Sequence, residues 1–298
     1  MAQVSRGAAP FLRHPASAGR PTVAAGRTSG PGGHALHRAG ALGLALLAVL
    51  LAAAILLPPA ATGSHKTVRP FLVYYGGPGP ESPARPQTLA RRLQGYPVVV
   101  LGLASAYPAF AAKVVRLMPH TTFYGYADTG HVTFAHVARR LELLHRVGMQ
   151  GVLLDEIGTG LSASRADLRR IVLLAQRDGL RVMLNAWDPS DVLSLPLRPR
   201  TDGVLCENWV YSGGAWVQRD AAVYAALRRL ERRHVLVFMI ATTKGVPSPA
   251  APPAAGISAT ARAVFGNYLS LSDPVYSADN DAIFPASTLR RQLRRLAF

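Results

Sequence analysis

Two adjacent carboxylates, Asp155 and Glu156, stand at the end of a short apolar run and are the residues best placed for chemistry. The run, residues 152–154, follows a glycine and lies between two amphipathic patterns, which favours a buried parallel strand. Carboxylates at the carboxyl end of such a strand stand where α/β folds keep their catalytic groups. The alternative is a structural role, in which one carboxylate caps the next helix or forms an ion pair.

Polar and aromatic residues recur at the ends of the other predicted strands. About half of the 16 acidic residues gather at these ends, which is unexpected for the solvated surface of an arginine-rich protein. Each aromatic residue can stack on a sugar ring or simply pack in the core. We expect the following residues to line one bowl and contact a substrate: Tyr75, Tyr126, Asp128, Asn185, Trp187, Asn208 and Trp209. Glu207 ends the sixth predicted strand as a further carboxylate.

Three chemistries could use such a bowl. A metal site would need histidines among the carboxylates, but the histidines fall at strand starts or within helices, so we expect no metal and no cofactor. A serine nucleophile would need an elbow motif that the sequence lacks. Two carboxylates with aromatic walls fit the cleavage of a glycosidic bond, where one protonates the leaving oxygen and the other attacks or activates water.

The elements that must position these residues alternate along the chain. Apolar runs predict strands at residues 71–75, 96–101, 121–126, 151–158, 181–185, 203–207, 235–240 and, weakly, 274–277. Helical patterns lie at 87–93, 109–117, 134–147, from Ser162 or Ser164 to Gly179, and at 220–233, 258–271 and 287–296.

Eight strand–helix units in about 230 residues match a (β/α)8 barrel in number and size. A doubly wound open sheet, the competing fold, usually carries a glycine-rich phosphate turn after its first strand. Residues 76–80 are glycine-rich, but their prolines remove amide donors and block the start of a helix. We therefore predict a (β/α)8 TIM barrel over residues 70–298.

The chain before the barrel has a different composition. Residues 1–38 hold five arginines and no acidic residue, and we expect a disordered basic tail in the cytoplasm. Residues 39–57 carry no charge and would span roughly 28 Å as a helix. This segment is either an uncut signal anchor or the apolar part of a signal peptide, followed by a linker at 58–69. In both cases we expect the barrel outside the cytoplasm, held at the cell membrane or secreted.

The net charge of +17 comes almost entirely from arginine. These arginines fall mostly on predicted helix faces without interleaved aromatics, so we expect no nucleic-acid partner. Cys206 is the only cysteine, which excludes an intrachain disulfide, and we expect it to be a small buried hydrophobe in a monomeric protein.

At these residues the chain resembles the spherulin-4-like family of extracellular (β/α)8 proteins, which includes endo-α-1,4-galactosaminidases. The resemblance covers about residues 70–240 and is strongest at 151–156, where the family has a strand ending in Asp-Glu. Other matching positions are Gly125 and Tyr126 with Thr129, Asn185 with Pro189, and Glu207. The resemblance implies that Asp155 and Glu207 are the essential carboxylates, with Glu156 as a supporting neighbour. The loop after the second strand and residues 186–188 depart from the family pattern, and these departures concern the substrate.

We therefore expect a glycosidase acting on an amino-sugar polymer, or alternatively a non-catalytic carbohydrate-binding barrel. A weaker hypothesis is a structural envelope protein. Asp155 would be the ionised nucleophile, with Glu156 turned outward because successive strand residues face opposite ways. Glu207, beside Cys206 and Trp209, would be the general acid in a more apolar setting. The basic exterior favours a neutral N-acetylated or an anionic polymer over a cationic one.

Overall fold

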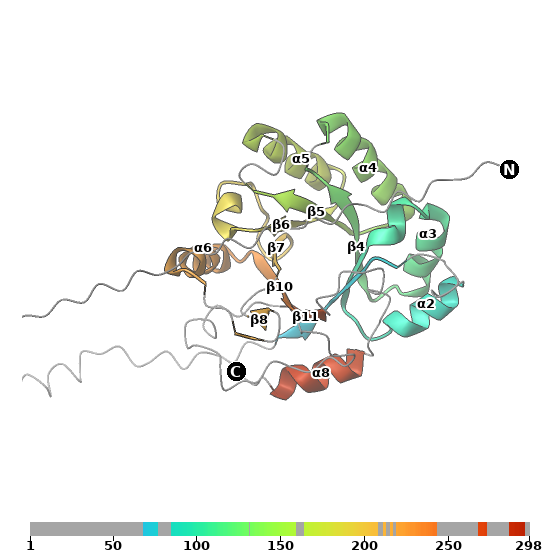
Figure 1. The fold of residues 1–298 in the computed structure, drawn as a ribbon. Coiled ribbons are helices and arrows are strands. Elements are labelled where there is room, and N and C mark those ends of the chain that lie inside the picture. The colour runs from blue at the N-terminus through green and yellow to red at the C-terminus, as the bar shows by residue number, and fades with distance from the viewer. Residues whose placement is uncertain are drawn as a thin grey trace, which may run out of the picture. The chain divides into compact units, whose positions relative to one another are not determined.

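The computed structural model describes residues 68–76, 85–130, 132–158, 164–207, 211–212, 215–216, 219–242, 268–272 and 286–295. All of them belong to one compact unit, His65–Phe298 (Figure 1). The predicted tail at 1–38, the apolar segment at 39–57 and all but the end of the linker at 58–69 lie outside the described residues. Among the helices that the structure describes, none has the length and apolarity needed to cross a membrane.

The strands form one parallel sheet in the order β1-β11-β10-β7-β6-β5-β4-β3-β2. Their bounds are β1 (Arg69–Pro70), β2 (Leu72–Tyr74), β3 (Val98–Leu101), β4 (Thr122–Asp128), β5 (Gly151–Ile157), β6 (Arg181–Ala186), β7 (Gly203–Cys206), β10 (Leu236–Thr242) and β11 (Tyr268–Ser272).

The two ends of this sheet are parts of the same chain segment. β1 pairs with β11 on one side, and β2, only one residue later, pairs with β3 on the other. Phe71 separates them. Counted as one interrupted strand, β1 and β2 join the last strand to the second, which is the hydrogen-bonding pattern of a TIM-barrel-like sheet.

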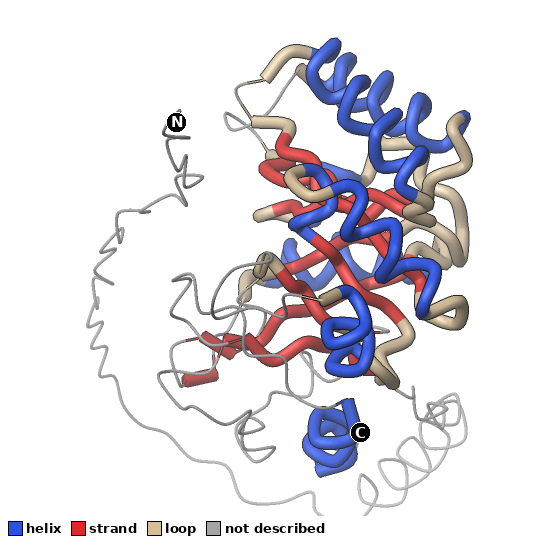
Figure 2. Tube along the Cα trace, turned by 90° about the vertical axis from the view of Figure 1, so that its right-hand side faces the viewer, coloured by secondary structure: helices blue, strands red, loops and turns tan. Residues whose placement is uncertain are grey.

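Helices cover the outside of the sheet (Figures 1 and 2). They are α2 (Pro86–Leu93), α3 (Pro108–Leu117), α4 (Phe134–Val147), α5 (Arg165–Arg177), α6 (Ala221–Arg232) and α8 (Ala286–Arg295), with short 3₁₀ helices η1 (Gly102–Ser105) and η2 (Pro189–Val192). A two-stranded antiparallel ribbon, β8 (Tyr211–Ser212) and β9 (Ala215–Trp216), follows β7.

The helix ends follow ordinary capping chemistry. Proline opens α2 and α3, where its missing N–H costs nothing. The side chains of Thr133 and Ser164 accept the N–H groups of His136 and Asp167 in the first turns of α4 and α5. Ser164 is one of the two caps, Ser162 or Ser164, that the sequence offered. Gly148 ends α4 with φ of 88°, a conformation that glycine adopts without a Cβ clash.

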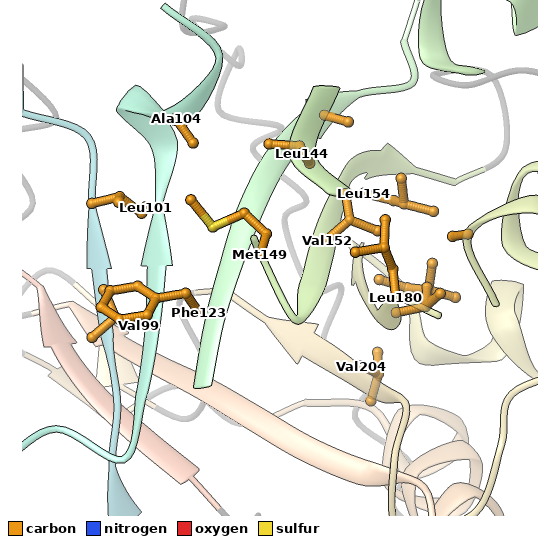
Figure 3. Close-up of a cluster of buried hydrophobic side chains, with 14 of the residues drawn as sticks. Val99, Leu101, Ala104, Phe123, Leu144, Met149, Val152, Leu154, Leu180 and Val204 are labelled. Atoms are coloured by element: carbon orange, nitrogen blue, oxygen red, sulfur yellow. The ribbon is translucent and has the colours of Figure 1, made fainter. Parts of the chain in front are cut away.

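Side chains of the sheet divide by alternation into two buried clusters. The larger cluster lies between strands and helices and includes Val152 and Leu154 from β5 (Figure 3). The smaller one fills the interior of the sheet and includes Phe71, Val98, Val100, Tyr124, Leu153, Met183, Leu205, Phe238 and Ile240. This period of two fixes which strand residues face inward.

The parallel α/β architecture is confirmed, with one difference at the level of elements. The last strand is Tyr268–Ser272, which overlaps the end of the helix that we expected at 258–271, while the expected strand at 274–277 lies outside the described residues. The run Tyr-Leu-Ser-Leu-Ser alternates apolar and polar residues, the mark of a strand, but a helical reading of the longer stretch concealed it. The connection after β6, for which the sequence predicted no helix, contains the 3₁₀ helix η2 among its described residues.

Candidate active site

The predicted site residues continue the inward-facing phase of their strands beyond the buried core. Each lies two residues after an interior side chain: Tyr126 after Tyr124, Asp155 after Leu153, Asn185 after Met183 and Glu207 after Leu205. Asp128 follows Tyr126 by the same step. These side chains therefore belong to the carboxyl ends of four neighbouring strands, β4, β5, β6 and β7.

The Asp155 carboxylate accepts three hydrogen bonds. Oδ1 accepts from Nδ2 of Asn185 at 2.6 Å and from the main-chain N–H of Glu156 at 2.9 Å, and Oδ2 accepts from the Tyr126 hydroxyl at 2.8 Å. Since all three groups act as donors, the carboxyl group is held as an acceptor.

Asn185 joins the two carboxylates that the sequence selected. Its Nδ2 donates to Asp155 Oδ1 at 2.6 Å and to Glu207 Oε1 at 2.9 Å. These two oxygens are therefore at most about 5.5 Å apart, the sum of both distances. Asp155 and Glu207 lie on the same side of the sheet, and Asn185 connects them.

A β-bulge interrupts β5 at Asp155 and Glu156. Leu154 pairs with Leu184 and Ile157 with Ala186, so Asp155 and Glu156 together stand opposite the single residue Asn185. Glu156 adopts φ of 59°, a left-handed conformation that is uncommon for a residue with a Cβ. Bulges occur next to active sites, where they redirect a side chain.

The bulge corrects our reason for turning Glu156 outward. In a regular strand Ile157 would face inward with Asp155, yet Ile157 packs in the cluster between strands and helices. Alternation therefore restarts at the bulge, and the phase of Glu156 does not follow from its neighbour. Glu156 is half-buried, and its described contact with Asp155 is made by its main-chain N–H.

Thr129 is a residue of this site that our predicted set left out. It is fully buried behind the bowl, and both its hydroxyl and its N–H donate to the main-chain oxygen of Asp155, at 2.6 and 3.3 Å. The only sequence signal was its place among the family-like positions. Asp128, its neighbour, pairs with Asp155 across β4 and β5, and its Oδ1 accepts the N–H of Gly130 at 2.7 Å.

Aromatic residues flank the carboxylates. The ring of Tyr75 meets that of Tyr126 edge to face, with centroids 5.6 Å apart. Burial, and then the neighbouring Asp155 carboxylate, raise the pKa of the Tyr126 phenol far above its ordinary value, so the phenol stays a donor. Trp187 follows β6 with 62% of its surface exposed, as a stacking platform requires. Asn208 and Trp209 lie outside the described residues.

The surroundings of Glu207 differ from our expectation in one respect. Cys206 faces the outer cluster, away from the bowl, so it does not provide an apolar wall for Glu207. Burial raises the pKa of the Cys206 thiol to about 12, which leaves it an uncharged packing group. A guanidinium N–H of Arg219 reaches the main-chain oxygen of Glu207 at 3.4 Å. Within the described part of the chain, no three His, Cys, Asp or Glu side chains are grouped to hold a metal ion.

Comparison with known proteins gives a distant likeness of fold. No family profile matches the chain, and no curated protein matches it. Among solved structures it is similar to the glycoside hydrolase domain of PelA from Pseudomonas aeruginosa, with a TM-score of 0.49, 17% identity and coverage of 70% of this chain and 95% of that domain.

Two other similar structures have unrelated activities. One is 3-keto-L-gulonate-6-phosphate decarboxylase from Vibrio cholerae, with a TM-score of 0.48, 9% identity and coverage of 77% and 98%. The other is a probable 2-pyrone-4,6-dicarboxylic acid hydrolase from Acinetobacter baumannii, with a TM-score of 0.45, 14% identity and coverage of 78% of this chain and 92% of that one. At this distance the neighbours do not distinguish one activity from another, so the function has to be argued from the site itself.

Proposed function

We propose that this protein is a glycoside hydrolase that uses Asp155 and Glu207 as its two catalytic carboxylates. The observation that carries the proposal is the amide of Asn185, which hydrogen-bonds both carboxylates and holds them in one bowl. Glycosidic cleavage requires such a pair on either side of the scissile bond. The exposed Trp187 and the Tyr75–Tyr126 pair supply aromatic surface beside it.

The roles of the two carboxylates follow from their partners. Asp155 accepts three hydrogen bonds, which fix the orientation of its carboxylate and suit attack on the anomeric carbon. Glu207 would protonate the leaving oxygen, and Asp155 would form the covalent glycosyl-enzyme. Glu207 would then take a proton from the water that releases the sugar. We propose retention of anomeric configuration, because one amide nitrogen bridges the two carboxylates, whereas an inverting pair needs room for a water molecule between them.

For the substrate we propose an amino-sugar polysaccharide of the galactosaminan type. This rests on the spherulin-4-like pattern at residues 151–156, Asn185 and Glu207, and on the pairing of Asp155 with Glu207 that the pattern implies. The alternative is a carbohydrate-binding barrel without turnover. A binding protein has no need for two carboxylates bridged across neighbouring strands, and we therefore prefer the enzyme.

The test is to incubate the full-length protein with N-acetylated, partly deacetylated and fully deacetylated α-1,4-galactosaminan and to follow new reducing ends. We expect cleavage of at least one polymer, with retained configuration in the first product by NMR. Asp155→Asn and Glu207→Gln, shown to be folded by circular dichroism, should each lower kcat by about 10³-fold or more. Equal activity of these variants would refute the assignment, and binding without cleavage by the wild type would favour the binding barrel.

We also propose that the barrel works outside the cytoplasm, with residues 1–38 inside. The uncharged run at 39–57 behind a basic tail supports this orientation. Protease added to intact cells should degrade the barrel of a full-length protein and spare an N-terminal epitope. Protection of the barrel would contradict the proposal.

A further inference from the structure

Thr129 lies directly behind the candidate nucleophile and contacts its main chain rather than its side chain. The residue follows β4, is 0% exposed and belongs to the strand phase that faces away from the bowl. Its hydroxyl donates to the Asp155 carbonyl oxygen at 2.6 Å, and its N–H donates to the same oxygen at 3.3 Å. Both lone pairs of that carbonyl are thereby directed toward β4.

The same peptide group controls the carboxylate. Turning the Asp155 carbonyl toward β4 sets the plane of the peptide that links Asp155 to Glu156, and the N–H of that peptide donates to Asp155 Oδ1 at 2.9 Å. The peptide leads into the left-handed Glu156, with φ of 59°, inside the bulge. A conformation of this kind is strained and persists only where its surroundings enforce it.

We propose that Thr129 is a positioning residue that holds the bulged peptide in place and thereby aims the Asp155 carboxylate. The proposal concerns the site of the proposed glycosidase but does not require its substrate to be known. Thr129 faces away from the bowl, so it acts on the reaction only through Asp155. Misplacing a reacting group by about 1 Å can lower a rate about a hundredfold, so removing the Thr129 hydroxyl should lower the reaction rate measurably.

Two substitutions isolate the hydroxyl. Thr129→Val keeps the shape and removes the donor, whereas Thr129→Ser keeps the donor. A matched control is Thr121→Val at the other end of β4, where a buried threonine hydroxyl donates to the main-chain oxygen of Tyr96 at 2.9 Å. Both valine variants leave a buried carbonyl with one hydrogen bond fewer, so both should lose a similar amount of stability.

The first measurement is hydrogen exchange of main-chain amides by NMR in the full-length protein, which needs no substrate. In Thr129→Val the Glu156 amide should exchange at least about tenfold faster than in the wild type. The exchange rate of the Leu153 amide should change only as much as the global stability of the variant changes. Thr129→Ser should restore the protection, and Thr121→Val should leave Glu156 as in the wild type. Unchanged exchange at Glu156 in Thr129→Val would overturn the proposal.

The second measurement is steady-state cleavage of the galactosaminan on which the wild type is active. Thr129→Val should lower kcat by about 10- to 100-fold with KM within about twofold, and Thr129→Ser should recover most of the rate. An equal loss in Thr121→Val would show a general loss of stability and would overturn the positioning role. If the wild type cleaves none of the polymers, the proposed function fails, while hydrogen exchange at Glu156 still decides the role of Thr129.

Discussion

At the scale of single residues, the side-chain amide of Asn185 uses both of its N–H bonds within the protein. One is directed to Asp155 and the other to Glu207, so neither is available to a sugar hydroxyl while both contacts hold. This modifies the substrate-binding role that we expected for Asn185, because only its carbonyl oxygen is left for a ligand. The residue sets the spacing of the two carboxylates instead.

Replacing this donor by an acceptor should disable the site in a pH-dependent way. Asn185→Asp has nearly the same shape but places a third carboxyl group between two others, and we expect kcat/KM at pH 7 to fall about 100-fold or more. Activity should recover in part as the pH is lowered, since a proton shared among the carboxyl groups replaces the lost donor. Asn185→Ala should lose activity without that recovery. Equal pH profiles for both variants would contradict the bridging role.

The hydroxyl of Tyr126 should contribute to activity through Asp155. Removing it in Tyr126→Phe deprives the carboxylate of one of three donors, and hydrogen bonds to charged groups contribute about 1.5–3 kcal/mol. We expect kcat to fall roughly 10- to 100-fold with an intact fold. The matched control is Tyr124→Phe, two residues earlier on β4 and inside the buried interior cluster, which should change stability but not kcat.

The raised pKa of Tyr126 has a separate consequence at alkaline pH. A phenol whose pKa is higher in the folded state than in the unfolded state binds its proton more tightly when folded. The resulting stability is complete below the ordinary tyrosine pKa of about 10 and declines as the pH rises above it. In an absorbance titration, Tyr126→Phe should have one tyrosine fewer than the wild type among those that ionise only on unfolding. If the variant instead has one tyrosine fewer among those that ionise near pH 10, the proposed environment of Tyr126 is wrong.

At the scale of elements, the sequence predicted seven of the eight strands close to their observed positions because each is a short apolar run between helical patterns. The same reasoning placed Asp155, Asn185 and Glu207 together, since carboxyl ends of parallel strands meet at one edge. It could not predict the bulge. A bulge is a property of two strands in register, and no local preference of Asp155 or Glu156 marks it.

The buried carboxylate of Asp202 connects the elements that carry Asn185 and Glu207, at the end of the strands opposite to the site. Asp202 is fully buried and accepts hydrogen bonds from the N–H of Val182 on β6, from Gln176 on α5, and from the main chain and guanidinium of Arg198. It therefore connects α5, the start of β6 and the segment that leads into β7. Burial makes each of these contacts costly to lose.

We expect Asp202→Ala to lower the free energy of unfolding by about 3 kcal/mol or more, because it leaves Arg198 and a buried N–H without their acceptor. The control is Asp178→Ala, which breaks a pair with Arg177, whose side chain is 75% exposed, and should cost less than about 1 kcal/mol. Urea denaturation measures both. Equal losses would show that the buried network does not stabilise β6 and β7.

At the scale of the whole molecule, the net charge of the chain and the charge of the candidate bowl are opposite. The chain carries a net charge of +17, whereas the carboxylates of Asp128, Asp155 and Glu207 lie at the carboxyl ends of β4, β5 and β7. Long-range approach of a polymer depends on the net charge, and contact within the bowl depends on the local carboxylates. Raising the ionic strength weakens the long-range effect of the net charge more than the close contacts within the bowl, so the two effects can be separated.

For a fully deacetylated, cationic galactosaminan we expect slow cleavage at low salt that rises with salt, relative to the N-acetylated polymer. The repulsion by the exterior acts over long distances and is screened beyond about 10 Å at 0.1 M salt. Rates of both polymers at several salt concentrations provide the measurement. A relative rate that falls with salt would show that the acidic bowl, and not the basic exterior, governs the encounter.

Aromatic side chains fill the interior of the barrel beneath the carboxyl ends of the strands. Gly151 and Gly203 lack side chains where the rings of Tyr124 and Phe238 pass, and a Cβ there would come within 2.5 and 2.6 Å of those rings. Phe71 packs edge to face on Phe238, and Tyr268 stacks on it at 4.5 Å. A sugar chain cannot thread along the barrel axis, so both of its ends must leave on the side by which it arrived. A polymer bound at Asp155 and Glu207 would lie across the opening of the barrel and could dissociate after any single cleavage.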